Sequence, residues 1–414
     1  MPFVLPFAGV ERRIAALRVI LLSACFVTLL ASMPLWSNTR AFPLLPIFHG
    51  FPILPGLGQK LLFYMLLLSL VVAGWFYRPA VLFFMAATFF AFCEDQNRGQ
   101  PWMYMYWGML GLTLLPQNVV LAACRCTVSV AYIWSGIQKC NVHFFHIVPE
   151  WFVAPAAMHW HFPHWAVTIL QWAVATAPIM ELAIGIALWS TRFRRVAIGM
   201  LLLVHLSALL FLGPLGYRYD LVVWPWNLAM MALVLVLFGS SEERRAPAMG
   251  GQSRRAPGWN AALRNSAFGE TLAELRRSRI AVALVALFSF LPVLSFAGWW
   301  DSYFSFTLFA ESQAKADIFV TAAFVERAPL DVALHIHKVR QAWDPRIQGP
   351  YVFDFQTWGY KQLHVPPIFE PRNYRSIYRY LRPYARRPNE LRMIIAPRAG
   401  AVMFYEGDRG IPLK

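Results

Sequence analysis

Long apolar stretches recur along the first three quarters of the chain, and short polar or basic segments separate them. A helix that crosses the roughly 30 Å core of a bilayer needs about 17 to 25 mostly apolar residues. Stretches of about that length occupy residues 14–35, 60–77, 79–95, 102–118, 119–139, 166–189, 195–213, 219–239 and 279–299. We therefore expect a polytopic α-helical membrane protein with about nine transmembrane helices.

Two segments need separate interpretation. The stretch 14–35 follows several arginines, as a signal peptide does, but about twenty apolar residues exceed a usual signal core, so we expect a retained span. Residues 144–165 are rich in Trp, His and Pro. They are too broken for a further full span and favour an interfacial or re-entrant segment.

The pattern becomes polar after Trp300. Short runs of β-forming residues lie at 304–308, 318–325, 332–337, 351–355, 393–396 and 402–405, and a helical pattern appears at 373–384. This predicts a small, β-rich α+β domain over residues 300–414, in which Ala399 and Gly400 turn the last hairpin.

The chain therefore divides into a transmembrane bundle, a linker, a last span and a terminal domain. The predicted bounds are 1–239, 240–278, 279–299 and 300–414. The segment 240–278 combines Gly, Ser and Pro with many arginines, which indicates a flexible, basic, cytoplasmic linker.

Composition supports a membrane location. Of 414 residues, 58% are hydrophobic and 14% are charged, whereas soluble domains carry about 25% charged residues. A net charge of +16 is also found in nucleic-acid-binding proteins, but here the basic residues lie between and after the apolar stretches. They are better explained as topology signals and contacts to anionic lipid, so we expect no nucleic-acid partner.

The arginines also predict the orientation, because Lys and Arg accumulate in cytoplasmic loops. With the N-terminus inside, the inner segments hold Arg12, Arg13, Arg18, Arg78, Arg192, Arg194, Arg195, Arg244, Arg245, Arg254, Arg255, Arg264, Arg276, Arg277 and Arg279. The outer loops hold only Arg40, Lys60, Arg98, Lys139 and Arg218. We expect a multi-pass protein of the cell inner (plasma) membrane with a cytoplasmic N-terminus and an extracytoplasmic C-terminal domain.

The cysteines give no metal or disulfide signature. None of Cys25, Cys93, Cys124, Cys126 and Cys140 forms a C-x-x-C pair, which argues against a zinc ribbon and against a disulfide framework. Cys93 and Cys140 both lie near the outer face, where an oxidised pair is conceivable.

Three polar segments fall at predicted outer helix ends, namely 94–102, 135–141 and 217–220. Polar groups at membrane depth are costly unless they are buried in protein or face water, so they are candidates for function. In the first segment, Asp95, Arg98 and Gln100 are candidates to position a substrate. Tyr104 follows and would extend the polar network; the alternative is an ordinary polar loop.

The second segment contains Lys139 at the end of a predicted helix. A partly desolvated lysine there is a candidate base or cation. The alternative is that Lys139 extends to the interface, as lysines at helix ends often do. Ser135 and Gly136 precede it and would allow a neighbouring backbone to approach closely.

Two further spans contain ionisable residues, Glu181 and His205. Glu181 is either a protonated residue bonded to a neighbouring helix or part of a substrate or proton site. For Trp224 to Asn227 we favour packing. A group of histidines admits interfacial packing, metal binding or a proton relay, and its spacing predicts no metal site; it comprises His143, His146, His159, His161 and His164.

Residues 132–141 resemble the signature Y-x-x-[AS]-G-x-x-K-x-[ND] of a membrane superfamily that includes DoxX-like proteins, the HTTM domain and the vitamin K-dependent gamma-glutamyl carboxylases. The resemblance covers roughly residues 10–240 and, loosely, an outer C-terminal domain. It implies that Lys139 matches the lysine implicated in carboxylases as the base that works with reduced vitamin K on the lumenal face. Pro101 and Trp102 stand where carboxylases carry an Asn-His pair, which argues against carboxylase chemistry and favours a quinone-interacting role.

The sequence thus predicts an integral membrane enzyme or redox-associated protein whose outward-facing pocket is centred on Lys139, with a quinone as cofactor. The predicted catalytic residues are Lys139 and Asp95, and the predicted binding residues are Arg98, Gln100, Tyr104, Asn141 and Glu181. One alternative is a non-catalytic assembly protein whose C-terminal domain binds an extracytoplasmic protein partner. Another is a proton-coupled transporter that uses Glu181 and His205.

Overall fold

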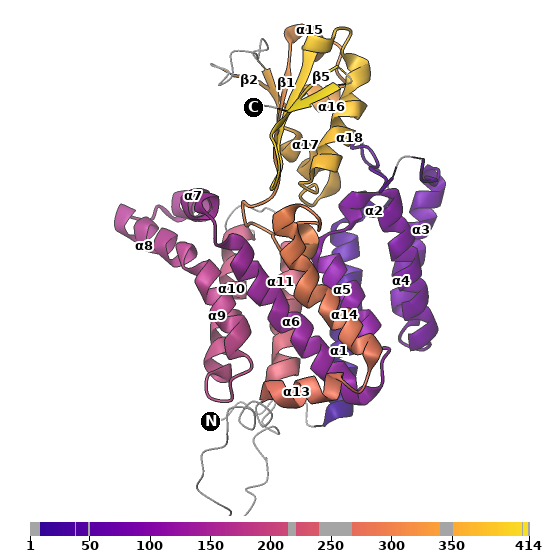
Figure 1. Cartoon of the computed structure of the whole chain (residues 1–414), viewed down its shortest axis with the longest axis vertical. Coiled ribbons are helices and arrows are strands. Elements are labelled where there is room, and N and C mark those ends of the chain that lie inside the picture. Colours follow the sequence, from indigo (N-terminus) through magenta and orange to yellow (C-terminus); the bar gives the residue numbers. More distant parts are fainter. Residues whose placement is uncertain are drawn as a thin grey trace, which may run out of the picture.

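A computed structural model of the chain describes residues 9–37, 39–48, 50–213, 221–239, 267–339, 351–407 and 409–412. It is mostly helical, with a bundle of helices and a small sheet at one end of the bundle (Figure 1). The bundle helices are α1 (Val10–Ala31), α2 (Met33–Ser37), α3 (Gly56–Val72), α4 (Tyr77–Glu94), α5 (Pro101–Leu112), α6 (Gln117–Lys139), α7 (Val142–Trp160), α8 (His164–Ala175), α9 (Ala177–Ala187), α10 (Arg194–Leu212), α11 (Val223–Phe238), α13 (Ala267–Leu275) and α14 (Arg279–Phe290).

Each predicted span coincides with one or two apolar helices, but their lengths differ from the prediction. In the described residues, five helices are long and apolar enough to cross a membrane: α1, α4, α6, α10, and α14 with its 3₁₀ continuation η3 (Leu291–Ala297). Helices α8 and α9 add a sixth if the pair, bent by 46°, is one span. Helices α3 and α11 are apolar but have only 17 and 16 residues.

Two differences from the predicted spans have a physical cause in proline. The predicted span 166–189 bends where α8 gives way to α9, because Pro178 at the start of α9 has no N–H to continue the earlier helix. The predicted span 102–118 is only the 12-residue α5, followed by a turn to Pro116, which starts α6. The predicted broken segment 144–165 is instead mainly the continuous helix α7, despite Pro149 and Pro155 within it.

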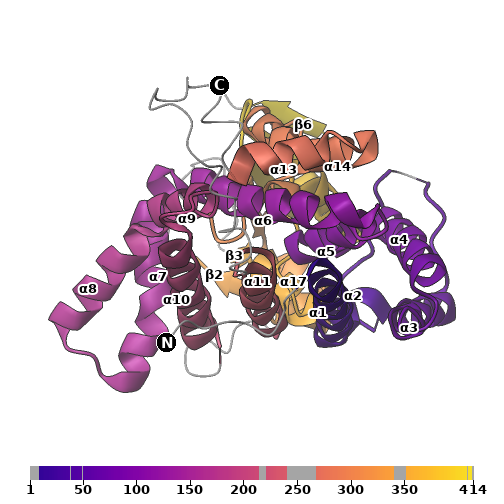
Figure 2. The same cartoon turned by 90° about the horizontal axis from the view of Figure 1, so that it is seen from below.

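Helix α6 is the centre of the bundle. Seen from below, it runs between α9 and α10 on one side and α1, α3 and α4 on the other (Figure 2). It packs against α9, α14 and α13. In Figure 1, α7 and α8 project from one side of the bundle, and α13 lies across the end opposite the sheet.

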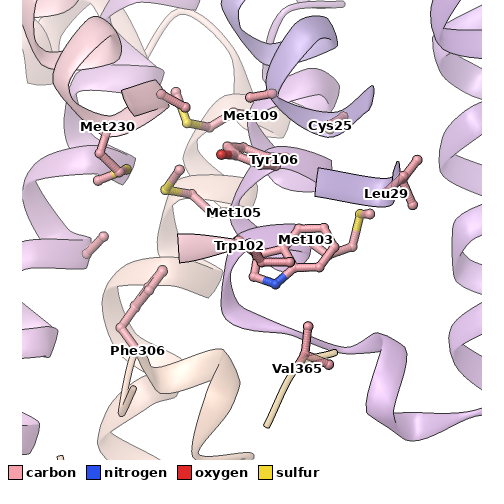
Figure 3. Packing of buried hydrophobic residues seen from close by; sticks show 14 of the residues in the cluster. Cys25, Leu29, Trp102, Met103, Met105, Tyr106, Met109, Met230, Phe306 and Val365 are labelled. Atoms are coloured by element: carbon pink, nitrogen blue, oxygen red, sulfur yellow. The ribbon is translucent and has the colours of Figure 1, made fainter. Parts of the chain in front are cut away.

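The interior of the bundle is apolar and continues into the C-terminal region. Figure 3 shows Trp102, Met105 and Tyr106 from α5 beside Cys25 from α1 and Met230 from α11. All are buried members of one hydrophobic cluster, which also includes Phe306 and Val365 from beyond the last bundle helix. The C-terminal region is therefore packed on the bundle rather than tethered to it.

Arginines at the end of the bundle opposite the sheet donate to carbonyls at helix C-termini. The buried Arg13 donates from Nε to Val236 O (2.9 Å) and from Nη2 to Leu237 O (2.7 Å) at the end of α11. Arg18 and Arg78 donate to Thr113 O and Leu114 O after α5. A cation at a helix C-terminus stabilises the helix by interacting with its dipole.

The sheet is antiparallel, with strand order β2-β3-β1-β4-β5-β6. Its strands are β1 (Lys315–Val320), β2 (Ile336–Lys338), β3 (Tyr351–Phe353), β4 (Leu391–Ala396), β5 (Met403–Glu406) and β6 (Arg409–Pro412), and the helices are α15 (Ala322–Val325), α16 (Leu330–Ala333), α17 (Phe355–Leu363) and α18 (Pro371–Leu381). The predicted turn at Ala399 and Gly400 is present, with Gly400 at φ 101° between β4 and β5, but it does not form the last hairpin, because β5 is followed by β6 and pairs with it.

Several predictions about this half of the chain are wrong. The expected strand 318–325 ends at Val320 and is followed by α15, and the expected strand 332–337 begins within α16, so that only its end belongs to β2. The expected strand at 304–308 is instead the 3₁₀ helix η4 (Tyr303–Ser305), whose last turn ends at Phe306 with φ 60°. Within the predicted linker 240–278, residues 267–275 form the amphipathic helix α13, whose apolar face packs on α6. The part of this linker before residue 267 lies outside the described residues.

Candidate functional site

The candidate site lies on one face of α6, at the end of the bundle that carries the sheet. Tyr132, Ser135 and Lys139 are spaced i, i+3 and i+7, so they share a face of the helix. That face is turned to α9 and α10. The neighbouring face, with Trp134 and Gln138, is turned to the other side, where Trp134 Nε1 donates to Ser289 O (3.0 Å) and Gln138 Nε2 donates to Ser295 Oγ (3.0 Å).

Lys139 forms a buried ion pair with Glu181 of α9. Its Nζ lies 2.7 Å from Glu181 Oε2 and donates a second hydrogen bond to Ser135 Oγ at 2.6 Å. Only 8% of the surface of Lys139 and 9% of that of Glu181 is exposed. A lysine that extended to the interface would leave its ammonium in water, so the snorkelling alternative does not describe this residue.

Two glycines allow α6 and α9 to approach closely enough for this pair. A Cβ on Gly136 would lie 2.6 Å from Pro178 O and 2.7 Å from Leu182 N. A Cβ on Gly185 would lie 2.9 Å from Ser129 O, and Ser129 Oγ donates back to Gly185 O at 2.6 Å. The contact is therefore backbone against backbone, as small residues permit in membrane helix packing.

A row of hydrogen-bonded polar side chains, the polar chain, runs from α6 to α10 and α11. Tyr132 OH lies 2.5 Å from His205 Nε2, and His205 Nδ1 lies 2.6 Å from Asn227 Oδ1. Asn227 Nδ2 donates to Val223 O at 2.6 Å, which fixes its amide so that Oδ1 is the acceptor. In the neutral imidazole, Nδ1 therefore carries the proton and Nε2 accepts from Tyr132.

The ion pair and the polar chain form one cluster. His205 is close enough to interact electrostatically with both Glu181 and Lys139, and Tyr132 with Glu181. Four helices, α6, α9, α10 and α11, thus meet around five ionisable or proton-carrying side chains: Tyr132, Lys139, Glu181, His205 and Asn227. This arrangement places a proton donor and a proton acceptor, the lysine and the carboxyl group, beside a neutral histidine in one buried cluster.

The pair retains unused hydrogen-bonding capacity. An ammonium has three donors and a carboxylate accepts at two oxygens. Within the described part of the chain, Lys139 uses two donors, and Glu181 accepts only at Oε2. One lysine N–H and Glu181 Oε1 remain for a further group.

The predicted site at Asp95 lies in a different polar cluster, and no hydrogen bond between described residues joins it to Lys139. Asp95 pairs with Arg40 and accepts at Oδ1 from Asn97 N (3.1 Å) and Asn97 Nδ2 (3.0 Å). It also accepts from Leu45 N. Its side chain is fully buried.

Arg98 fills all of its hydrogen-bonding capacity inside this cluster. Its five N–H groups go to Leu35 O, Ala91 O, Glu94 Oε2, Trp36 O and Gln59 Oε1. Glu94 in turn accepts from Leu54 N (2.7 Å) and Gln59 Nε2 (2.9 Å). A saturated network of this kind positions backbone and leaves no group for a substrate.

The same cluster holds the C-terminal region on the bundle. Gln100 Nε2 donates to Pro366 O (3.0 Å), and Asn97 Oδ1 accepts from Ile368 N (3.1 Å). Gln96 accepts from Arg372, which also forms a bidentate pair with Asp301. A role of Asp95, Arg98 and Gln100 in positioning a substrate stays a prediction from the sequence, and the contacts observed are intramolecular.

The remaining predicted binding residues have packing or capping contacts. Tyr104 stacks between Phe288 and Phe304, with ring centroids 4.6 and 4.7 Å away. Asn141 caps α7 by accepting from Phe144 N and donates to Ala310 O (2.7 Å) of the C-terminal region. The polar segment 217–220 lies outside the described residues.

In the described ranges, no group of three or more His, Cys, Asp or Glu side chains is placed to hold a metal ion. The five cysteines are free thiols, and Cys93 is buried while Cys140 is exposed. An oxidised pair between them is not formed in the structure.

Comparison of the chain with protein-family models, with curated proteins and with solved structures gave no match. The geometry described above is therefore the basis on which a function is proposed.

Sequence reasoning missed Tyr132 and Asn227. The spacing of Tyr132, Ser135 and Lys139 already placed the tyrosine hydroxyl on the lysine face of a helix. Asn227 is an amide within an apolar helix, which is itself a signal of function or buried bonding. Its neighbours Trp224, Pro225 and Trp226 are typical of membrane interfaces, so the sequence alone favours a packing role for this segment.

Proposed function

We propose that this protein is a membrane-embedded enzyme or redox partner that exchanges protons with a lipid-soluble quinone at Lys139 and Glu181. The observation that carries the proposal is the buried, unsaturated ion pair. Its two charges are removed from water, held 2.7 Å apart and left with one donor and one acceptor. Buried ionisable residues with unfilled hydrogen-bonding capacity inside apolar helices are candidates for a functional site.

Membrane residence is supported by the outward faces of the helices. Large apolar side chains are exposed on them, including Leu61, Leu68, Val19, Leu203, Val196, Trp172 and Ile169. An apolar surface of this extent is stable in lipid and not in water. We propose about nine spans in all, with the shorter helices α3, α5 and α11 included.

The orientation is supported by the arginines that cap helix ends opposite the sheet. Cytoplasmic ends of spans carry the positive residues. We therefore propose a cytoplasmic N-terminus and an extracytoplasmic C-terminal region. Lys139 ends α6 near the proposed outer face, and the neighbouring Gln138 accepts a hydrogen bond from Arg398 of the C-terminal region.

The proton chemistry follows from the geometry of the pair. When the shared proton resides on Glu181, the Lys139 amine is neutral and would accept a proton from a hydroxyl group of a hydroquinone. When it resides on Lys139, the ammonium stabilises a developing oxyanion. Tyr132 and His205 lie beside the pair and adjust its polarity. This assignment agrees with the resemblance of residues 132–141 to a superfamily that includes quinone-linked proteins.

The test is to identify the lipids that purify with the protein. Wild type, Lys139→Met and Glu181→Gln are solubilised in the same detergent, and their lipids are extracted and analysed by mass spectrometry. Wild type is expected to retain a quinone, and both variants are expected to lose most of it. Binding of added short-chain quinone and hydroquinone to the delipidated proteins provides a second readout.

The chain offers a matched control in Lys315→Met. Lys315 pairs with Glu311 at 3.1 Å, but 45% of its side chain is exposed in the C-terminal region. Loss of this second Lys–Glu pair should leave quinone retention unchanged. Well-folded wild type that neither retains nor binds quinone contradicts the proposal.

A second candidate is a non-catalytic assembly protein, favoured by α18. This strongly amphipathic helix buries Tyr374, Ile377 and Tyr378 and presents the exposed Arg379 on its other face. The exposed Arg386 and Arg387 follow it. Such a basic ridge suits an acidic protein partner. If Arg379→Glu abolishes function while Lys139→Met does not, the protein is an assembly protein and the proposed enzyme function is wrong.

A further inference from the structure

The polar chain has one direction of hydrogen-bond donation, and Asn227 sets it. Asn227 Nδ2 lies 2.6 Å from Val223 O, and Asn227 Oδ1 lies 2.6 Å from His205 Nδ1. Exchanging the two amide atoms would place Oδ1 against the carbonyl oxygen of Val223, with no hydrogen between the two oxygens. The amide oxygen therefore faces the imidazole, and Nδ1 is the ring nitrogen that carries the proton.

His205 transmits this direction to Tyr132. His205 is buried, with 6% of its surface exposed, and burial favours the neutral ring, which has one donor and one acceptor. With the proton on Nδ1, the acceptor Nε2 receives the hydrogen bond from the Tyr132 hydroxyl group at 2.5 Å. The three side chains belong to α11, α10 and α6, so a residue on α11 orients the hydroxyl group on α6 (Figure 2).

This arrangement leaves Tyr132 with an oxygen that is able only to accept. A tyrosine hydroxyl group has one hydrogen, and Tyr132 donates it to His205. Tyr132 lies on the Lys139 face of α6 and interacts electrostatically with Glu181. Among the described residues, the hydrogen-bonding positions that remain on this face are two acceptors, the Tyr132 oxygen and Glu181 Oε1, and one donor, the third N–H of Lys139.

We propose that Asn227 and His205 are positioning residues that make Tyr132 an acceptor, so that the site selects a ligand with a ring hydroxyl group over one with a ring carbonyl group. This inference rests on the proposed function, for which the selected form is the hydroquinone. A hydroquinone hydroxyl group donates to Tyr132 and accepts from Lys139. A quinone carbonyl accepts from Lys139 but meets the Tyr132 oxygen with no hydrogen between them. One hydrogen bond corresponds to about a tenfold difference in affinity.

The experiment measures the affinity of the purified, delipidated full-length protein for decylubiquinone and for decylubiquinol, each kept in one oxidation state under anaerobic conditions. Wild type is expected to bind the hydroquinone about tenfold more tightly. Asn227→Leu removes the acceptor of Nδ1, and Tyr132→Phe removes the hydroxyl group, so each should bring the two affinities together. A preference that survives Tyr132→Phe overturns the inference. The matched control is Tyr64→Phe on α3, a tyrosine that is 58% exposed, and it should keep the preference.

A conservative variant separates positioning from packing. His205→Gln retains a carbonyl oxygen that is able to accept from Tyr132 and should keep the hydroquinone preference, whereas His205→Leu should lose it. Thermal unfolding checks that each variant is folded. If Asn227→Leu does not fold, Tyr132→Phe keeps the test valid, because it removes a single oxygen atom.

Nitrogen-15 NMR of labelled histidine measures the tautomer without any ligand. The signals of His205, assigned by their loss in His205→Gln, should show a protonated Nδ1 and an unprotonated Nε2 in wild type and a mixture of tautomers in Asn227→Leu. The opposite tautomer in wild type overturns the inference. Equal affinities for the two forms, both lost in Lys139→Met, also overturn it but leave the quinone site in place. Binding of neither form to folded wild type overturns both proposals.

Discussion

Two buried polar clusters lie toward the end of the bundle that carries the sheet, and they differ in how completely their hydrogen bonds are filled. Around Arg98, all five donors of the guanidinium are used, and Glu94 and Asp95 accept several hydrogen bonds each. Around Lys139, the ammonium donates to Glu181 and Ser135, and one ammonium N–H and Glu181 Oε1 have no hydrogen bond among the described residues.

The difference teaches that buried polarity in an apolar helix bundle does not by itself mark a reactive site. Both clusters are costly in a low-dielectric interior, and both require compensation. The hydrogen bonds of the saturated cluster go to loops and to the C-terminal region, so this cluster holds those segments on the bundle. The unsaturated pair is the one with groups left to meet a substrate. The following predictions break or sharpen this comparison.

The largest expected effect is on stability, from Arg98→Met. This change leaves Glu94 buried without its cation and five acceptors without their donor, which should cost about 3–5 kcal/mol. Thermal unfolding in detergent measures it, with the exposed Arg192→Met as the control. A loss below about 1 kcal/mol would show that the cluster is not a structural clamp.

Gly136→Ala should destabilise the protein by about 1–3 kcal/mol and separate Lys139 from Glu181, because the added Cβ meets Pro178 O at 2.6 Å. Gly199→Ala on α10 is the matched control. Nothing lies within 4 Å of the Cβ that it adds, so it should be neutral or slightly stabilising. Both are read by thermal unfolding, and quinone retention should fall only in Gly136→Ala.

Removing the reactive pair altogether should affect stability less than breaking it. Lys139→Met alone leaves Glu181 without its hydrogen-bond donor and should cost about 1–3 kcal/mol, whereas Lys139→Met with Glu181→Leu should return to within about 1 kcal/mol of wild type. Quinone binding should be absent from both. A double-mutant cycle on melting and binding separates the two effects; recovery of binding in the double variant would contradict the proposed role.

The smallest effect is expected at the ion pair of Arg327 with Glu390 in the C-terminal region. Burial raises the pKa of Glu390. Hydrogen bonds from the amides of Arg386 and Arg387, together with the charge of Arg327, lower it by more, so the pKa lies below its ordinary value.

Because the folded pKa of Glu390 is depressed, its stabilising contribution is present above the unfolded pKa of about 4.3 and is lost as the pH falls through the folded pKa. The melting temperature of wild type should therefore exceed that of Glu390→Gln near pH 6, and the difference should shrink toward about pH 3. A difference that grows on acidification would reverse the assigned sign.

The sequence by itself determined where the apolar helices lie and where the chain turns polar. The hydrophobic pattern located most of the apolar helices, because burial and bilayer crossing both depend on consecutive apolar side chains, but it missed α7 and α13 and did not show the break between α8 and α9. The same pattern singled out Lys139 and Glu181 as costly charges in apolar surroundings. It also identified the turn at Gly400 between β4 and β5, where φ is positive, but not the later hairpin of β5 and β6.

Only the tertiary structure decided which of these polar groups belong together. Lys139 and Glu181 are 42 residues apart, and Asp95 and Arg40 are 55 apart. Their pairing depends on how closely whole helices approach, through Gly136 and Gly185, and on the loops that fold back over the bundle. Periodicity fixes the face on which a side chain lies along one helix, but the partner on another helix is set by packing in three dimensions.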